Sequence, residues 1–74
     1  MNANEVRKLG RILTRERLGL APNTPISDWR IARTIHEDMG VTVKAVEHWL
    51  YGVRSIPGPA TKLLKLLAQQ SRPG

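Results

Sequence analysis

The chain contains no cysteine and no phenylalanine, and none of its apolar runs is long enough to span a membrane. Without cysteine, neither disulfides nor thiolate metal sites can stabilise the fold. Without phenylalanine, the volume of the core must come from Trp29, Trp49 and the leucines. The N-terminus also lacks the apolar segment of a signal peptide, so the sequence predicts a cytoplasmic protein.

Acidic residues are also scarce: six aspartates and glutamates stand against twelve lysines and arginines, for a net charge of +6. The excess lies in residues 1–20 and 41–74, while residues 21–40 are slightly acidic. A small basic domain is typical of proteins that bind a polyanion, usually a nucleic acid. The length of 74 residues leaves room for one core, so we predict a single domain over residues 1–70 and a disordered tail over 71–74.

Apolar spacing predicts an all-α, four-helix domain. The expected helices run from Ala3 or Glu5 to residue 18, from 28 to 39, from 43 to 51, and from Gly58-Pro59 to about residue 70. Asn2 or Asn4 can cap the first helix, and Gly19 can end it. Ser27 and Thr24 compete as N-cap of the second helix, and Ser27 is preferred because Ile26 and Ile31 then form a hydrophobic staple.

The same spacing predicts which side chains are buried. The expected inner positions are Val6, Leu9, Ile12 and Leu13, then Ile31, Ala32, Ile35 and Met39 with Trp29 at their edge, then Val46 and Trp49, then Val53 and Ile56 in a loop, and finally Ala60, Leu63, Leu64 and Leu67. The basic residues of the first helix, namely Arg7, Lys8, Arg11, Arg15 and Arg17, are expected on its outer face and mostly solvated.

The most informative stretch is residues 40–54. Gly40 can take the left-handed conformation that ends a helix, and Thr42 is a good N-cap for the next one. A short helix with inward-facing Val46 and Trp49 then runs to Gly52. A helix, a glycine turn and a short second helix are the layout of a helix-turn-helix, which places its second helix in the major groove of DNA.

This stretch resembles the phage repressor and Cro family, also called Xre-type regulators. The resemblance rests on Gly40-Val41-Thr42, on Val46-x-x-Trp49-x-x-Gly52-x-Arg54 and on Ile56-Pro57-Gly58-Pro59, and it covers roughly residues 27 to 67. It implies a lambda repressor-like fold with a central helix-turn-helix. Two features depart from the family pattern. Many members open both motif helices with glutamine, and those positions here carry Asp28 or Trp29 and Val43. The first motif helix is also about one turn longer than usual, because the family's small alanine would fall at His36.

Helix geometry assigns Val43, Lys44, Glu47 and His48 to the outward side of the short helix. Lys44 can pair with guanine O6 and N7 or with a phosphate, and Glu47 can accept from cytosine N4. Val43 can contact a thymine methyl group. His48 can reach a base or a phosphate, or it is simply a solvated surface side chain.

A second group of residues is suited to the DNA backbone. Ser27 and Thr42, at helix N-termini, can bring hydroxyl and amide groups to phosphates. Arg30 and Arg33 can add positive charge near the start of the second helix. Arg54, in the loop after the short helix, is a candidate phosphate clamp, and the family resemblance implies a backbone contact there too.

The leucines of the last helix allow two interpretations. Either they all complete the core, or Leu66, with Leu63 or Leu67, forms the contact of a two-fold dimer. A single short recognition helix seldom gives enough specificity alone, so we expect a homodimer.

An enzyme is not expected. His36-Glu37-Asp38-Met39-Gly40 begins like a zinc-protease motif, but that motif needs a second histidine at the position of Gly40. His36 and His48 have no further ligands with which to build a metal shell. The sequence therefore predicts no catalytic residue, no metal, no cofactor and no small-molecule substrate.

Together these features predict a homodimeric transcriptional repressor that binds an inverted repeat in double-stranded DNA. The family resemblance implies a phage or mobile-element regulator of its own operon, and anti-CRISPR-associated regulators are one such group. One alternative is the antitoxin of a toxin–antitoxin pair. A further alternative is a basic interaction or membrane-surface module that uses residues 61–67 as an amphipathic anchor.

Overall fold

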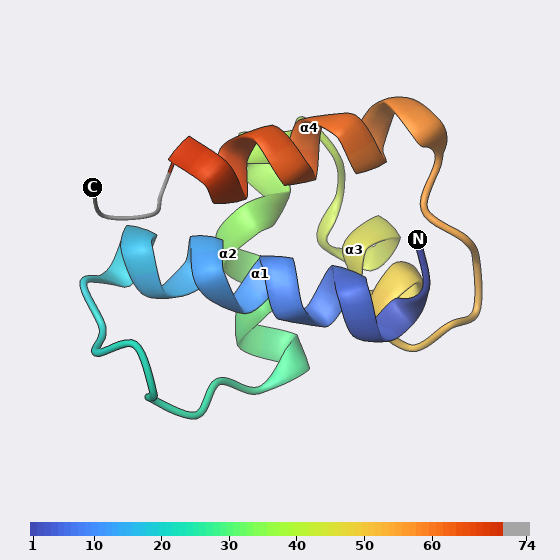
Figure 1. Ribbon diagram of the computed structural model, residues 1–74. Coiled ribbons are helices and arrows are strands. Elements are labelled where there is room, and N and C mark those ends of the chain that lie inside the picture. The colour runs from blue at the N-terminus through green and yellow to red at the C-terminus, as the bar shows by residue number, and fades with distance from the viewer. Residues whose placement is uncertain (71–74) are drawn as a thin grey trace.

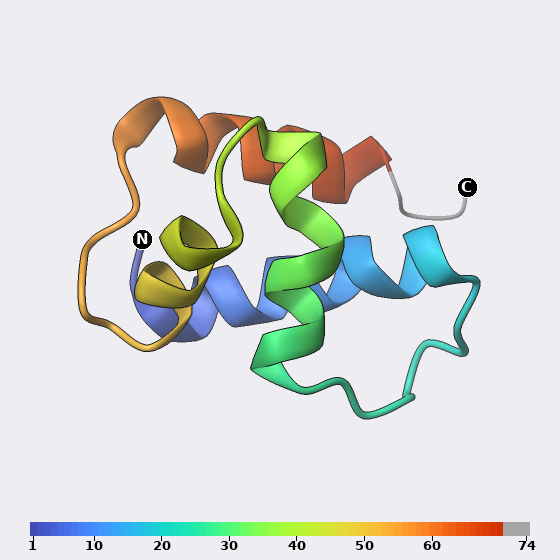
Figure 2. The ribbon, with the colours of Figure 1, turned by 180° about the vertical axis from the view of Figure 1, so that it is seen from behind.

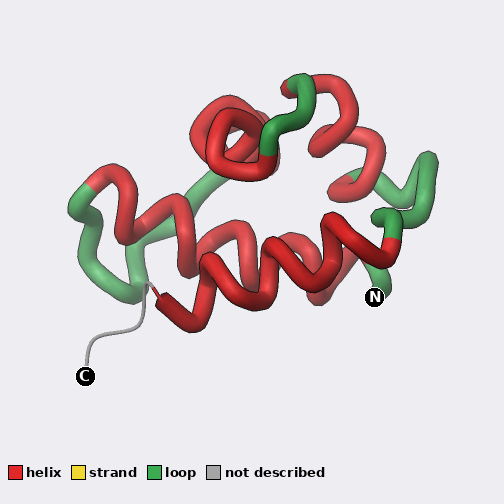
Figure 3. Tube along the Cα trace, turned by 90° about the horizontal axis from the view of Figure 1, so that it is seen from above, coloured by secondary structure: helices red, strands yellow, loops and turns green. Residues whose placement is uncertain are grey.

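The computed structural model describes residues 1–70, and the predicted disordered tail, 71–74, lies outside them (Figure 1). The described chain forms four helices: α1 (Ala3–Leu18), α2 (Asp28–Met39), α3 (Val43–Leu50) and α4 (Gly58–Gln70). Figure 3 shows only helix and loop over these residues, with no strand. The predicted all-α, four-helix class is therefore confirmed.

Short-range signals explain where the helices begin. The side chains of Asn2, Ser27 and Thr42 accept hydrogen bonds from the backbone amides three residues later, at 2.9, 3.3 and 3.1 Å. Each bond satisfies an amide that has no partner within its own helix. Both Ile26 and Ile31 are buried, as a hydrophobic staple across Ser27 requires. Helix α4 begins at Gly58, within the predicted Gly58-Pro59 opening, and Pro59 occupies its second position.

The helices pack around one core. Helix α4 contacts α1 and runs across Figure 1 in the same direction, while α2 crosses them and α3 lies near the start of α1. Seen from behind in Figure 2, α2 and α3 form the near side of the molecule. The largest side chains that are completely buried are Leu13, Ile31, Ile35, Leu50, Leu64, Val6 and Val46.

Two predictions about the core are wrong, and one buried residue is not among those predicted. Trp29 is 56% exposed and contributes little volume to the core. It lies off the buried stripe of Ile31, Ile35 and Met39, because successive residues of an α-helix point about 100° apart. Val53 is 65% exposed and does not anchor the loop, whereas Ile56 does, as predicted. Ala68, which was not predicted, is buried beside Leu64.

Gly10 allows α1 and α2 to approach closely. A Cβ atom built at Gly10 would lie 2.7 Å from Cγ2 of Ile31 and 3.6 Å from Cδ1 of Ile35. The first distance is well below van der Waals contact, and the methyl group belongs to a β-branched side chain with little rotamer freedom. The absence of a side chain at Gly10 therefore sets the spacing of the two helices.

Gly10→Ala should therefore destabilise the protein. Alanine gains about 1 kcal/mol in helix propensity, but overpacking against Ile31 costs about 1–3 kcal/mol, so we expect a net loss of about 1 kcal/mol in chemical denaturation. The matched control is Gly58→Ala, since nothing lies within 4 Å of a Cβ at Gly58. Equal stabilisation by both substitutions would contradict the close packing.

Candidate nucleic-acid interface

The turn between α2 and α3 is fixed by hydrogen bonds on both sides. Gly40 has φ 68°, and its amide donates to the carbonyl of Glu37 at 3.1 Å. The next amide, of Val41, donates to the carbonyl of His36 at 3.0 Å, which closes a Schellman-type end to α2. Three residues thus separate two helices without a loose linker, as the glycine turn in the sequence predicted.

His36 lies on the side of α2 that faces this turn. Its Nδ1 lies 3.1 Å from the carbonyl oxygen of Val41. Because a carbonyl can only accept, Nδ1 must carry the proton that makes this bond. The imidazole therefore braces the turn from the α2 side. Within residues 1–70, no cluster of three or more histidine or acidic side chains could hold a metal ion.

Helix α3 is held by one side and exposed on the other. Val46, Trp49 and Leu50 are buried in the core, and Trp49 is only 7% exposed. On the other side Lys44 is exposed, while Glu47 and His48 are half-buried with part of each side chain accessible. These three side chains share one surface, as helical spacing predicted.

Val43 differs from the prediction that it faces outward. It is half-buried and packs against the core cluster. Val43 precedes the buried Val46 by three residues and the buried Leu50 by seven, which places it on the inner side of α3. A thymine contact by Val43 is therefore restricted to the accessible part of its side chain.

The predicted backbone-contact residues are at the surface. Ser27, Arg30, Arg33, Thr42 and Arg54 are all exposed. The hydroxyls of Ser27 and Thr42 accept from their own helices, which leaves each O–H free to donate. None of the three arginines forms an ion pair with another residue of the described chain, 1–70.

Helix α1 contributes less free charge than the sequence indicated. Arg7 pairs with Asp28, and Arg17 pairs with Asp38 at 3.0 Å. Arg15 donates to the carbonyl of Thr24 at 3.0 and 3.2 Å. The prediction that most basic side chains of α1 are merely solvated is therefore wrong for these three. These three arginines contact residues outside α1, and the helical periodicity of α1 cannot predict such contacts.

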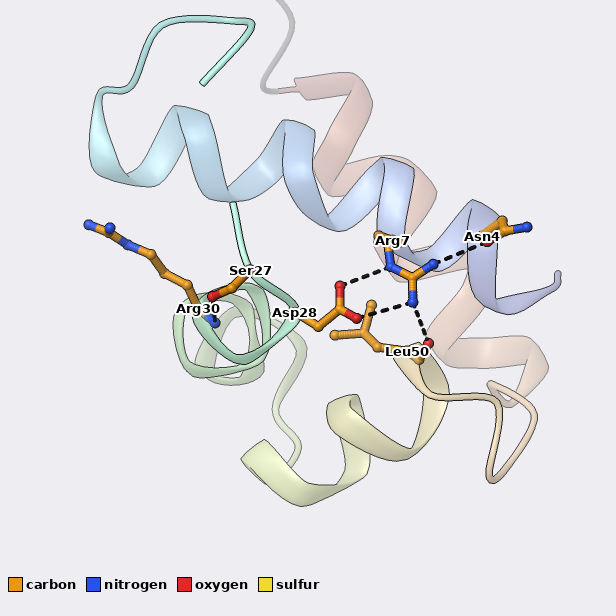
Figure 4. A network of polar contacts seen from close by, with 6 residues as sticks. All are labelled: Asn4, Arg7, Ser27, Asp28, Arg30 and Leu50. Atoms are coloured by element: carbon orange, nitrogen blue, oxygen red, sulfur yellow. Dashed lines mark hydrogen bonds and ion pairs between the residues drawn. The ribbon is translucent and has the colours of Figure 1, made fainter. Parts of the chain in front are cut away.

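Arg7 makes the most extensive of these contacts. Its Nε and Nη2 donate to the two carboxylate oxygens of Asp28 at 2.8 and 3.1 Å, and Nη2 also donates to the carbonyl of Leu50 at 3.0 Å (Figure 4). The hydrogen bond to Asp28 raises the pKa of the Arg7 guanidinium, against the opposing effect of partial burial. One side chain thus joins α1, the start of α2 and the end of α3.

The predicted dimer residues are not equally accessible. Leu66 is 51% exposed, whereas Leu63 and Leu67 are half-buried and pack against the core. Leu66 is therefore the best placed of the three to contact another molecule.

No helix in the described part of the chain has both the length and the apolar content to cross a bilayer.

Comparisons of this chain with protein-family models, with curated proteins and with solved structures found no match.

Proposed function

We propose that this chain is a sequence-specific DNA-binding protein in which α3 is the recognition helix. The observation that carries the proposal is the two-sided character of α3. Val46, Trp49 and Leu50 fix it to the core, while Lys44 is exposed and Glu47 is partly accessible, which offers a donor and an acceptor on the other side. A rigidly held helix with such a surface fits the major groove of B-DNA, where base edges present complementary groups.

The distribution of charge supports the same partner. The chain carries a net charge of +6, and the carboxylates of Asp28 and Asp38 are already engaged by Arg7 and Arg17. The guanidinium groups of Arg30, Arg33 and Arg54 are left without intramolecular carboxylates within residues 1–70 and are suited to phosphates. Ser27 and Thr42 supply hydroxyl donors to the same backbone.

We further propose that the protein acts as a homodimer on an inverted repeat and represses transcription in the cytoplasm. An eight-residue recognition helix contacts only a few base pairs, and a two-fold dimer doubles the sequence that is read. The exposed Leu66 supplies an apolar contact for a second copy. The resemblance to phage repressors makes the promoter of its own operon the first operator to examine, in a phage, a mobile element or an anti-CRISPR-associated operon.

The membrane-surface alternative has less support, because the apolar side of α4 is already used. Leu64 and Ala68 are buried, and Leu63 and Leu67 pack against the core, so only Leu66 remains for a bilayer. The antitoxin alternative uses the same DNA interface and differs only by an additional protein partner.

Substitutions at Arg54 and at Lys44 or Glu47 should have different consequences. Arg54→Ala should weaken binding to all duplexes alike and reduce the slope of log K against log salt by about 1, because one phosphate contact is lost. Lys44→Ala and Glu47→Ala should instead change which duplexes are preferred, each by about 1–3 kcal/mol at the affected base pair. The measurement is selection from a random duplex library, followed by titration at several salt concentrations. Uniform losses from all three substitutions would mean that α3 does not read bases.

A further inference from the structure

The chain has only three aromatic residues, and two of them are on the surface. Trp49 is buried, but Trp29 is 56% exposed and Tyr51 is 55% exposed. Tyr51 follows Glu47 and His48 at helical spacing and belongs to the predicted recognition helix, whereas Trp29 is predicted at the edge of the core with no binding role. Large rings with a polar tip are enriched where proteins meet other molecules, because they combine apolar area with a hydrogen-bond donor.

The two exposed rings adjoin the same junction. Asp28 immediately precedes Trp29, and Leu50 immediately precedes Tyr51. The guanidinium of Arg7 bonds to the Asp28 carboxylate and to the Leu50 carbonyl at once, as Figure 4 shows. The start of α2 and the end of α3 therefore meet at one side chain, and an exposed aromatic residue follows on each.

A positive charge is held against one of the rings. The Cζ atom of Arg33 lies 5.0 Å from the centroid of the Trp29 ring, within the range of a cation–π contact. The Arg33 guanidinium has no ion pair with another residue of the described chain, 1–70, so its N–H groups remain free to donate to a ligand. His36 follows Arg33 on the same side of α2 and contacts Val41, so Trp29 and Arg33 lie on the side of α2 from which the turn to α3 departs.

The chemistry of this aromatic patch, defined as Trp29, Arg33 and Tyr51, selects an anionic and amphipathic partner. Covering Arg33 with an apolar surface would desolvate a charge that has no carboxylate partner among residues 1–70. Phosphate oxygens can instead accept from Arg33, from the indole N–H and from the tyrosine hydroxyl. The apolar ring faces can rest on deoxyribose. Glu37, one turn after Arg33, and Glu47, one turn before Tyr51, are the acidic neighbours on these two helices.

We propose that the aromatic patch is a second DNA contact, which grips the sugar–phosphate backbone beside the C-terminal end of α3. The proposal rests on the proposed DNA-binding function and extends it. The patch adds affinity without reading sequence, because phosphate and sugar are the same at every base pair. It also gives a role to the exposed Trp29, which lies outside the recognition helix.

Fluorescence provides the first test. In the free protein, acrylamide should quench Trp29 readily and Trp49 poorly, since only Trp29 is exposed. Adding duplex DNA should protect the wild-type protein from quenching. The Trp29→Phe variant reports Trp49 alone, so its quenching should not change. Wild-type quenching that is unaffected by saturating duplex would overturn the proposal.

Affinity provides the second test. Trp29→Ala and Tyr51→Phe should each weaken binding about threefold to tenfold, equally on selected and on random duplexes, which corresponds to loss of one hydrogen bond. Both variants should melt close to the wild type, because the altered groups are exposed. The control is Leu18→Ala, an exposed apolar residue at the C-terminal end of α1, which should bind normally.

The outcomes separate this proposal from the function on which it rests. If the wild type binds duplex DNA and both variants bind within twofold of it, the patch is not a DNA contact, although the recognition helix remains one. If Trp29→Ala alters the molecular mass in sedimentation while DNA affinity is unchanged, the patch is a protein interface and the proposal is wrong. If the wild type binds no duplex, both proposals fall together.

Discussion

Replacing Trp49 by alanine should lower the free energy of unfolding by about 3–5 kcal/mol. The indole is 7% exposed and packs within the cluster that includes Val46, Leu50 and Ile56. Its removal would leave a cavity at the point where α3 meets the rest of the domain. Small domains have a total stability of about 5–15 kcal/mol, so this loss should leave the variant close to unfolding. Urea or thermal denaturation followed by circular dichroism is the measurement.

Trp29→Ala is the matched control for this substitution. It removes the same side chain from an exposed position, so its unfolding midpoint should stay near that of the wild type. DNA binding by Trp49→Ala should fail because the fold fails. A Trp49→Ala protein that melts like the wild type but no longer binds DNA would refute the core assignment and make Trp49 a contact residue.

Most of what the sequence predicted correctly depends on short-range interactions. Asn2, Ser27 and Thr42 were recognisable as N-caps because their bonds reach only three residues along the chain. Gly19 and Gly40 were recognisable as helix ends because glycine tolerates positive φ. Both adopt it, at 65° and 68°. Such signals are complete within one turn of helix and need no knowledge of the rest of the fold.

The errors arose where burial is decided by distant elements. Trp29 is the exception, because its large size suggests burial while its spacing within α2 already directs it away from the buried stripe. Ala68 was overlooked for its small size, yet it is buried while Leu66, two residues earlier, is half-exposed. Which face of α4 is covered depends on α1, and the sequence of α4 alone does not specify that.

The candidate interface shows the same division. The outward position of Lys44 follows from spacing within α3, because Val46 and Trp49 define the opposite side. The Arg7–Asp28 ion pair joins residues 21 positions apart, and the bond from Arg7 to Leu50 spans 43. Neither could be predicted from periodicity. The cation–π contact of Arg33 with Trp29 has the i, i+4 spacing of neighbours on a helix and was within reach of the sequence, had Trp29 been recognised as exposed.

The homodimer leads to the second large effect. A two-fold dimer presents two copies of α3, so its operator should be an inverted repeat with half-site centres about 10 base pairs, or one helical turn, apart. Linking two half-site contacts raises affinity for the full repeat about 10²- to 10⁴-fold over a single half-site. A substitution that separates the protomers should remove that gain and leave half-site binding weak but intact.

Leu66 is the position at which to test this, since it is 51% exposed and its substitution should leave the monomer folded. Leu66→Lys and Leu66→Glu should both yield monomers in sedimentation equilibrium and bind the full repeat no better than a half-site. The pair of substitutions separates dimerisation from charge, because a purely electrostatic effect would strengthen binding for lysine and weaken it for glutamate. Leu18→Lys is the control for adding charge at another exposed leucine.

Footprinting of the DNA upstream of the encoding operon should show a symmetric protected repeat with the wild type and none with either Leu66 variant at the same concentration. Protection of one asymmetric site by a monomeric wild type would rule out the dimer, and an unprotected upstream region would rule out self-repression.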